Sequence, residues 1–226
     1  MDVRKIVNAL IMDIANGVSI SQVLLKAQII AYNLGDEKFS QYIKCEQQGY
    51  SPNDTLPSYR KQKTLVKATF VGPFQTSQTV EVHCEAIEDK CIRNLLTFAS
   101  LRDSLILIEK MYENAESEMV RTSVPVFAYP TIKSLYKDCG GMDIYSAYQC
   151  FPKEALLTIV ETFKSQLLDI LMQFDKKLDW KLDMSSSKNK DIATTIINNV
   201  YHINAVVANT GIGNVETKDI KLEEKQ

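Results

Sequence analysis

The residues best suited to chemistry lie in one short stretch, where a predicted helix gives way to strands. The stretch combines a carboxylate, a guanidinium and two phenols with a helix-ending glycine and a proline: Glu46, Gly49, Tyr50, Pro57, Tyr59 and Arg60. One interpretation is a folded joint in which Arg60 pairs with Glu46 and the tyrosine rings pack beside them. The alternative is a pocket in which the same groups act on a substrate. We favour the joint, because paired charges at such positions stabilise geometry without catalysing a reaction.

Other catalytic constellations have little support in the sequence. The only histidines are His83 and His202, which lie in segments far apart along the chain, so a zinc site would lack ligands. The phosphate-binding and hydrolase patterns GxxxxGK[ST], GxGxxG and GxSxG do not occur. We therefore expect no metal and no cofactor, and the residues by themselves name no reaction.

The charge balance restricts the kind of partner. The chain of 226 residues carries 26 Lys and Arg against 28 Asp and Glu, a net charge of −2. Nucleic acids and anionic membranes attract proteins through a positive field, so we expect neither as a partner. No stretch approaches the ~18 uninterrupted apolar residues of a membrane-spanning helix. The start MDVRKIVNAL lacks a signal-peptide core, and the five cysteines form no CxxC pair, so we expect a cytoplasmic protein with free thiols.

Apolar spacing predicts helices, and strict alternation predicts strands. The predicted helices cover 3–14, 19–35, 36–49, 89–111 with a break allowed at 100–104, and 152–180. The predicted strands cover 64–71 and 79–84, which form a hairpin, with 123–129 as a candidate edge strand because Pro125 cannot donate to a ladder. These elements predict an α+β fold: an N-terminal helical unit, a small antiparallel sheet and a long C-terminal helix that covers the sheet.

The long helix from Pro152 to about Trp180 carries one apolar stripe. Its members are Leu156, Val160, Phe163, Leu167, Ile170, Leu171, Phe174 and Leu178. Its length is typical of the organising element of a helical bundle or of a dimer seam.

The composition changes after Asp183. Residues 184–190 are rich in Ser, Lys and Asn and predict a linker between a domain at 1–183 and a tail at 191–226. The tail combines β-branched residues with asparagines, which is typical of strands that stack between chains. We expect it to be β-prone and to self-associate through its apolar members: Ile196, Ile197, Val200, Ile203, Val206, Val207 and Ile212. The competing interpretation is that residues 196–207 fold back on their own body.

Four motifs in the first third of the chain are found together in a known family. They are Leu24-Leu25-Lys26-Ala27, Leu34-Gly35-Asp36, Glu46-Gln47-Gln48-Gly49-Tyr50 and Leu56-Pro57-Ser58-Tyr59-Arg60. This run resembles the opening of the AbiTii family of bacterial abortive-infection proteins, with Gln47 in place of the usual Leu. The turn at 71–74 and the long helix also fit, so the resemblance covers about Ile6 to Trp180.

The resemblance implies a role in antiphage defence in a bacterial cytoplasm, and it implies no particular reaction. Two function classes stay open. In the first, the protein is an assembly or effector module that self-associates through its tail and binds a phage component or a neighbouring defence protein. In the second, it is a nuclease-like toxin enzyme that uses the junction of Glu46 and Arg60. The shortage of histidines and metal ligands favours the first class.

Overall fold

The N-terminal helices begin and end at the expected capping residues. In the computed structural model, which describes residues 2–136 and 141–209, they are α1 (Val3–Ala15), α2 (Ile20–Leu34) and α3 (Glu37–Gln48). Asp36 caps α3 by accepting a hydrogen bond from the Phe39 amide, and Gly35 ends α2 in the left-handed conformation with φ 64°. The three predicted helices are confirmed.

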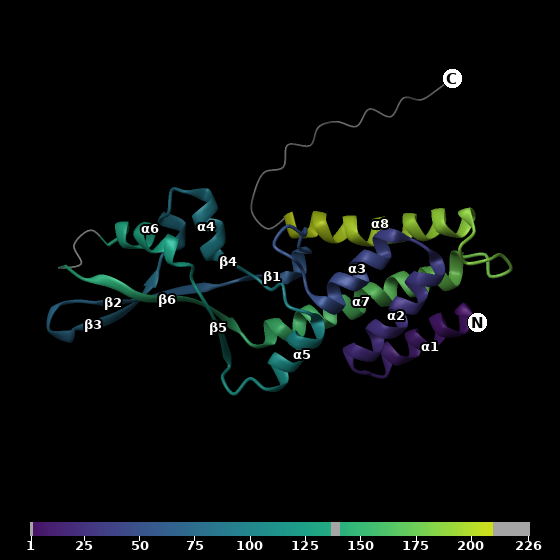
Figure 1. Ribbon diagram of the computed structural model, residues 1–226, viewed down its shortest axis with the longest axis horizontal. Helices are drawn as coiled ribbons and strands as arrows, with labels where there is room; N and C mark the ends of the chain where they lie inside the picture. The colour runs from purple at the N-terminus through teal and green to yellow at the C-terminus, as the bar shows by residue number, and fades with distance from the viewer. Residues whose placement is uncertain (1, 137–140, 210–226) are drawn as a thin grey trace, which may run out of the picture.

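Three further helices complete a helical body around α1 to α3. They are α5 (Leu105–Glu113), α7 (Glu154–Lys177) and α8 (Ser187–Asn209). Figure 1 shows α7 running through the body, and it packs against α1, α5 and α8. The predicted apolar stripe from Leu156 to Leu178 is buried in the core of this body, which confirms the long helix as its organising element. None of the described helices has an apolar stretch long enough to cross a membrane.

The strands form a second unit beside the helical body. A four-stranded antiparallel sheet has the order β3 (Ser77–Val82), β2 (Leu65–Val71), β6 (Asp143–Pro152) and β5 (Met119–Ser123), and a separate pair joins β1 (Lys61–Lys63) to β4 (Phe98–Ser100). The predicted hairpin is confirmed: Ala68 of β2 faces Val80 of β3, and it faces Ala147 of β6 on its other side. Residues of α4 (Lys90–Thr97) and α6 (Tyr129–Ser134) share a core with one face of the sheet, and Figure 1 shows both helices on that side.

Several expectations about the sheet are wrong. The edge strand lies at Met119–Ser123, and the residues after Pro125 are helical in η4 (Val126–Ala128) and α6. The long helix does not cover the sheet, because its stripe matches the apolar faces of the body helices while the short α4 and α6 cover the sheet. The central strand β6 was not predicted. A register shift leaves Tyr145 opposite no residue of β2, and this bulge interrupts the alternation that marks a strand.

The C-terminal segment also differs from expectation. Residues 187–209 form the helix α8 and not strands, and Ala193, Ile196, Ile197 and Val200 are buried in the core of the helical body. Their spacing of three and four residues is typical of a helix, although the composition of the segment is typical of stacking strands. The strand prediction is therefore wrong for the described part of the segment, which folds back on its own body.

Polar contacts fix the position of α8. Asn189 has no exposed area; its Oδ1 accepts from the Asp179 amide at 2.9 Å, and its Nδ2 donates to the Asp179 and Asp183 carbonyls at 3.2 and 3.1 Å. The Thr194 hydroxyl donates to the cap residue Asp36. The predicted linker at 184–190 is thus a short turn followed by the first turn of a packed helix. Ile203, Val206 and Val207 lie on α8 beyond the described side chains, and Ile212 lies outside the described residues.

Candidate functional site

The predicted junction residues come together at the end of α3. Helix η1 (Ser58–Arg60) brings Tyr59 and Arg60 to this point, and the loop after β4 closes it through a hydrogen bond from the Tyr50 amide to the Arg102 carbonyl at 2.7 Å. The junction therefore lies where the chain leaves the helical body for the strands.

Both carboxylate oxygens of Glu46 accept hydrogen bonds. Oε1 accepts from the Tyr50 hydroxyl and, at 2.6 Å, from the Tyr59 hydroxyl, while Oε2 accepts from Nη2 of Arg60. Neither Glu46 nor Arg60 has any exposed area. The predicted ion pair with flanking tyrosines is confirmed, and a carboxylate so enclosed offers no oxygen to a substrate in this arrangement.

The hydrogen bonds in this cluster have a defined direction. The Tyr59 hydroxyl lies 2.8 Å from the Tyr42 hydroxyl, and its single hydrogen is already given to Glu46. Tyr42 must therefore donate to Tyr59 in that contact. A chain of donors leads from Tyr42 on α3 through Tyr59 to the buried carboxylate, so the orientation of the Tyr42 hydroxyl depends on the ion pair.

Arg60 also holds the neighbouring loop. Its Nη1 donates to the carbonyl oxygens of Leu101 and Asp103 at 3.2 and 2.6 Å, and its guanidinium carbon lies 5.2 Å from the centre of the Tyr50 ring. The Arg60 side chain therefore links α3, its own helix η1 and the loop after β4.

The glycine and the proline of the motif have backbone roles. Gly49 ends α3 at φ 93° and ψ 168°, a conformation that favours glycine, and a Cβ there would lie 2.9 Å from the Arg102 carbonyl oxygen. Pro57 accepts from the Arg60 amide at 3.0 Å and begins η1. Together they let the end of α3, η1 and the β4 to α5 loop approach closely.

Burial and the negative charge of Glu46 set the protonation of the cluster. Burial, followed by the Glu46 carboxylate, raises the pKa of Tyr50 and of Tyr59 well above the ordinary phenol value. Burial alone would lower the pKa of Arg60, but the carboxylate outweighs it, so this pKa is raised overall. All three groups keep their protons at neutral pH, so the donors to Glu46 are permanent.

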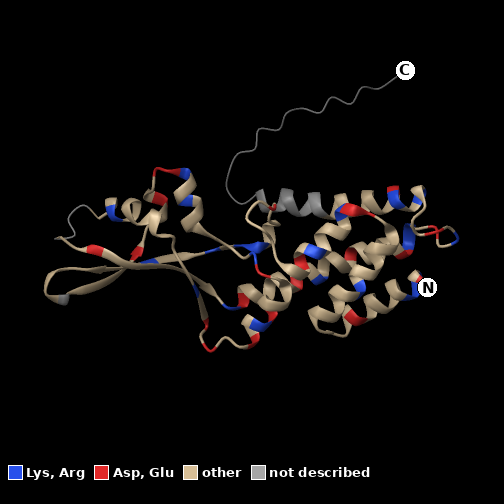
Figure 2. Cartoon of the chain, viewed as in Figure 1, with Lys and Arg blue, Asp and Glu red and all other residues tan. Residues whose placement is uncertain are grey.

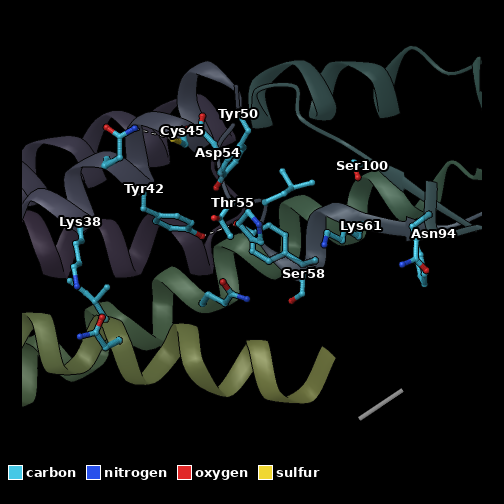
Figure 3. A pocket seen from close by; sticks show the side chains of 18 of the residues that line it. Lys38, Tyr42, Cys45, Tyr50, Asp54, Thr55, Ser58, Lys61, Asn94 and Ser100 are labelled. Atoms are coloured by element: carbon cyan, nitrogen blue, oxygen red, sulfur yellow. Dashed lines mark hydrogen bonds between the residues drawn. The ribbon is translucent and has the colours of Figure 1, made fainter. Parts of the chain in front are cut away.

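A groove runs along the outer side of the junction, between α3 and α8. Its volume is about 1290 Å³, and its walls include Tyr42, Tyr50 and Tyr59 of the cluster. Figure 3 shows Lys38 toward one end, Tyr42 and Ser58 in the middle, and Asn94 at the far end. Tyr50 and Tyr59 thus line the groove while their hydroxyl groups donate to the buried Glu46 carboxylate.

Gln166, one of the residues that line this groove, was not singled out from the sequence. Gln166 of α7 lines it, is 6% exposed, and has no partner for its Oε1 among the described residues. The available signal was a glutamine at apolar spacing, since Gln166 follows Phe163 by three residues and precedes Ile170 by four. Among the described residues, no group of His, Cys, Asp or Glu is arranged to hold a metal ion.

The helical body, the small antiparallel sheet and the buried, tyrosine-flanked ion pair between them define a two-part α+β protein with a groove at its joint. The AbiTii family model matches residues 4–198, most of the chain, so this chain belongs to the AbiTii family. The match continues past the expected limit at Trp180 into α8, the helix that forms one wall of the groove. No curated protein and no solved structure matches the chain.

Proposed function

We propose that this protein acts in bacterial antiphage defence by abortive infection, as an effector that binds a partner in the groove between α3 and α8. Membership of the AbiTii family supports the defence role. The observation that carries the binding role is the groove itself, whose tyrosine wall is held in place from behind by the Glu46 ion pair. In this proposal the junction fixes the shape of the groove and takes no part in a reaction.

The enclosure of Glu46 separates this proposal from the competing one, a nuclease-like toxin. A catalytic carboxylate must reach its substrate or a water molecule, whereas both oxygens of Glu46 are engaged by Tyr50, Tyr59 and Arg60. Binding at the open groove requires no rearrangement of these contacts.

Self-association is the second part of the proposal. The buried Ile196, Ile197 and Val200 already serve the protein's own core, so assembly is assigned to the chain beyond them. It would bring many effector bodies together during infection, and a phage component or a neighbouring defence protein bound in the groove would act as the trigger.

The defence role is tested by expressing the chain in a bacterium and challenging it with a panel of phages. Abortive infection predicts fewer plaques together with arrest or death of cells infected at high multiplicity, whereas surviving cells would indicate a different kind of defence. An Asn94→Ala variant, changed at an exposed groove residue, should lose protection while its melting temperature is unchanged. Unaltered protection in this variant and in Gln166→Met would contradict a role for the groove.

A further inference from the structure

The outer face of α2 is apolar although it lies at the surface of the helical body. Leu25 is 54% exposed, Ile29 39% and Tyr32 84%, while the inner face of the same helix is buried in the core. Lys26 is the single charged residue among the 15 residues of α2, and it forms an ion pair with Asp13 of α1. A helix that is apolar all round is usually covered on every side, so the outer face of α2 has the character of a contact surface.

The exposed residues of this face have the spacing of a helix-packing seam. Gln22, Leu25, Ile29 and Tyr32 follow one another at intervals of three, four and three residues, and all four are exposed. This is the spacing of the a and d positions through which one helix packs against another. The face therefore fits a second helix better than it fits a flat or irregular surface.

The surface around this seam carries no unpaired charge. Residues 8–16 of α1 and 22–32 of α2 include two charged residues, Asp13 and Lys26, which pair with each other, although 24% of the whole chain is charged. Met12 is 58% exposed and adds apolar area on the neighbouring helix α1, and Figure 2 shows both helices mostly in the tan of uncharged residues. Where a surface meets its own copy, each charge near the two-fold axis faces an identical charge and is repelled. A face without unpaired charge therefore fits a second copy of this chain, and it offers nothing to a partner recruited by opposite charge.

The seam has the same pattern in both directions along the helix. Leu25 and Ile29 form an apolar centre, and Gln22 and Tyr32 place a polar group at either end. When two copies of α2 pack antiparallel about a two-fold axis, Leu25 faces Ile29 of the second copy, and Gln22 faces Tyr32. The amide and the phenol hydroxyl can then form a hydrogen bond, which gives the apolar centre and polar rim typical of protein interfaces. The opposed helix dipoles favour this direction over a parallel pair.

We propose that this protein forms a homodimer in which the outer faces of two α2 helices pack antiparallel. The four seam residues and Met12 make a smaller contact than the roughly 20–30 residues per side of a standard interface, so the dimer is weak and forms as the concentration of the chain rises. The inference is independent of the groove and its ligand. It is also independent of assembly through residues 210–226, because α2 lies in a different part of the chain.

The test is sedimentation velocity of the purified full-length chain from micromolar to near-millimolar concentrations, which should show reversible association with a dimer as its first step. Leu25→Glu places a carboxylate without a partner at the centre of the contact and should weaken dimerisation by about tenfold or more. Leu107→Glu is the matched control, because Leu107 is 46% exposed on α5, and it should leave dimerisation unchanged. Tyr32→Ala is a second variant that should also weaken the dimer, and it keeps the test valid if Leu25→Glu misfolds. All three changes lie at exposed side chains and should leave the melting temperature unchanged.

Mixing two single variants tests the pairing of the helices. Leu25→Lys and Ile29→Glu should each associate poorly alone, because each buries a charge opposite an apolar side chain. Their mixture should dimerise, since the antiparallel pair places the introduced ammonium opposite the introduced carboxylate and keeps one contact of Leu25 with Ile29. A mixture no heavier than its components overturns the antiparallel pair.

Two further results overturn the proposal. A chain that stays monomeric over the whole range of concentration assigns the outer face of α2 to a different protein. Association that Leu25→Glu and Tyr32→Ala both leave intact places assembly elsewhere, as expected for residues 210–226. These measurements use purified protein and no phage, so they can succeed where the phage challenge fails, and the reverse.

Discussion

The Glu46 carboxylate and the Arg60 guanidinium form an ion pair in which neither side chain has any exposed area. One residue comes from the last turns of α3 and the other from η1, so the pair joins the helical body to the start of the strands. When one partner of a buried pair is removed, the other keeps its charge in a low-dielectric site, and the fold loses more than the attraction itself.

Arg60→Ala should therefore destabilise the protein strongly. We expect the free energy of unfolding to fall by roughly 3–5 kcal/mol, measured by urea denaturation. Arg121→Ala is the control, because Arg121 is exposed on β5 and its guanidinium carbon lies 4.8 Å from the centre of the Tyr148 ring. This substitution should lower the free energy of unfolding by about 1 kcal/mol or less. Equal losses for the two variants would contradict the structural role of Arg60, and loss of phage protection with unchanged stability would support the functional interpretation instead.

Gly49→Ala should destabilise the protein more than Gly17→Ala. Both glycines have positive φ, 93° and 70°, but a Cβ at Gly49 would lie 2.9 Å from the Arg102 carbonyl oxygen, whereas a Cβ at Gly17 would have no atom within 4 Å. The conformation of Gly49, with φ 93° and ψ 168°, is essentially restricted to glycine, so the variant at this site combines a backbone penalty with the clash against the loop. Similar melting temperatures for the two variants would contradict both effects.

The tyrosine cluster should make the protein sensitive to alkali. The folded chain keeps the Tyr50 and Tyr59 protons to higher pH than the unfolded chain, because the pKa of each phenol is raised on folding. Their contribution is complete below the unfolded phenol value of about 10 and is lost as pH rises above it, with a slope of roughly 1.4 kcal/mol per pH unit for each tyrosine. Urea unfolding across the alkaline range should show a shallower loss for Tyr59→Phe. Tyr32→Phe, at a side chain that is 84% exposed, should keep the full slope, and identical slopes for both variants would refute the assignment.

The two parts of the C-terminal segment should behave differently when removed. A chain that ends at Asn209 keeps the core residues of α8 and should melt like the full chain, while a chain that ends at Ser186 loses Ala193, Ile196, Ile197 and Val200 from the core and should melt at a much lower temperature. If the chain beyond α8 drives assembly, light scattering should give a larger mass for the full chain than for the chain ending at Asn209. Equal monomeric masses for those two would rule out assembly through residues 210–226.

The elements that could be predicted from the sequence are those that depend on residues close together in the chain. The apolar stripe of α7, the caps of α2 and α3 and the β2 to β3 hairpin depend on local spacing and turns, and the ion pair of Glu46 with Arg60 could be inferred because opposite charges lay at one predicted joint. The bulged strand β6 and the groove could not be inferred, since Tyr145 interrupts the pattern and the groove gathers side chains from segments distant in the chain. For α8, composition and periodicity predict different structures, and the buried residues follow the helical periodicity because the helix packs against the body.

The order of strands in the sheet determines which parts of the protein can fold while the chain is still being synthesised on the ribosome. Strand β2 pairs with β6, where Leu65 faces Cys150, so a neighbour of β2 is translated long after β2 itself. Until β6 leaves the exit tunnel, the edge of β2 that faces away from β3 is unpaired, while α1 to α3 can already pack together from local contacts. The nascent chain is thus expected to pack α1 to α3 first, to complete the sheet when β6 emerges, and to complete the helical body only when α7 and α8 follow. A protein assembled in this order gains its complete shape only when nearly all of it has been synthesised.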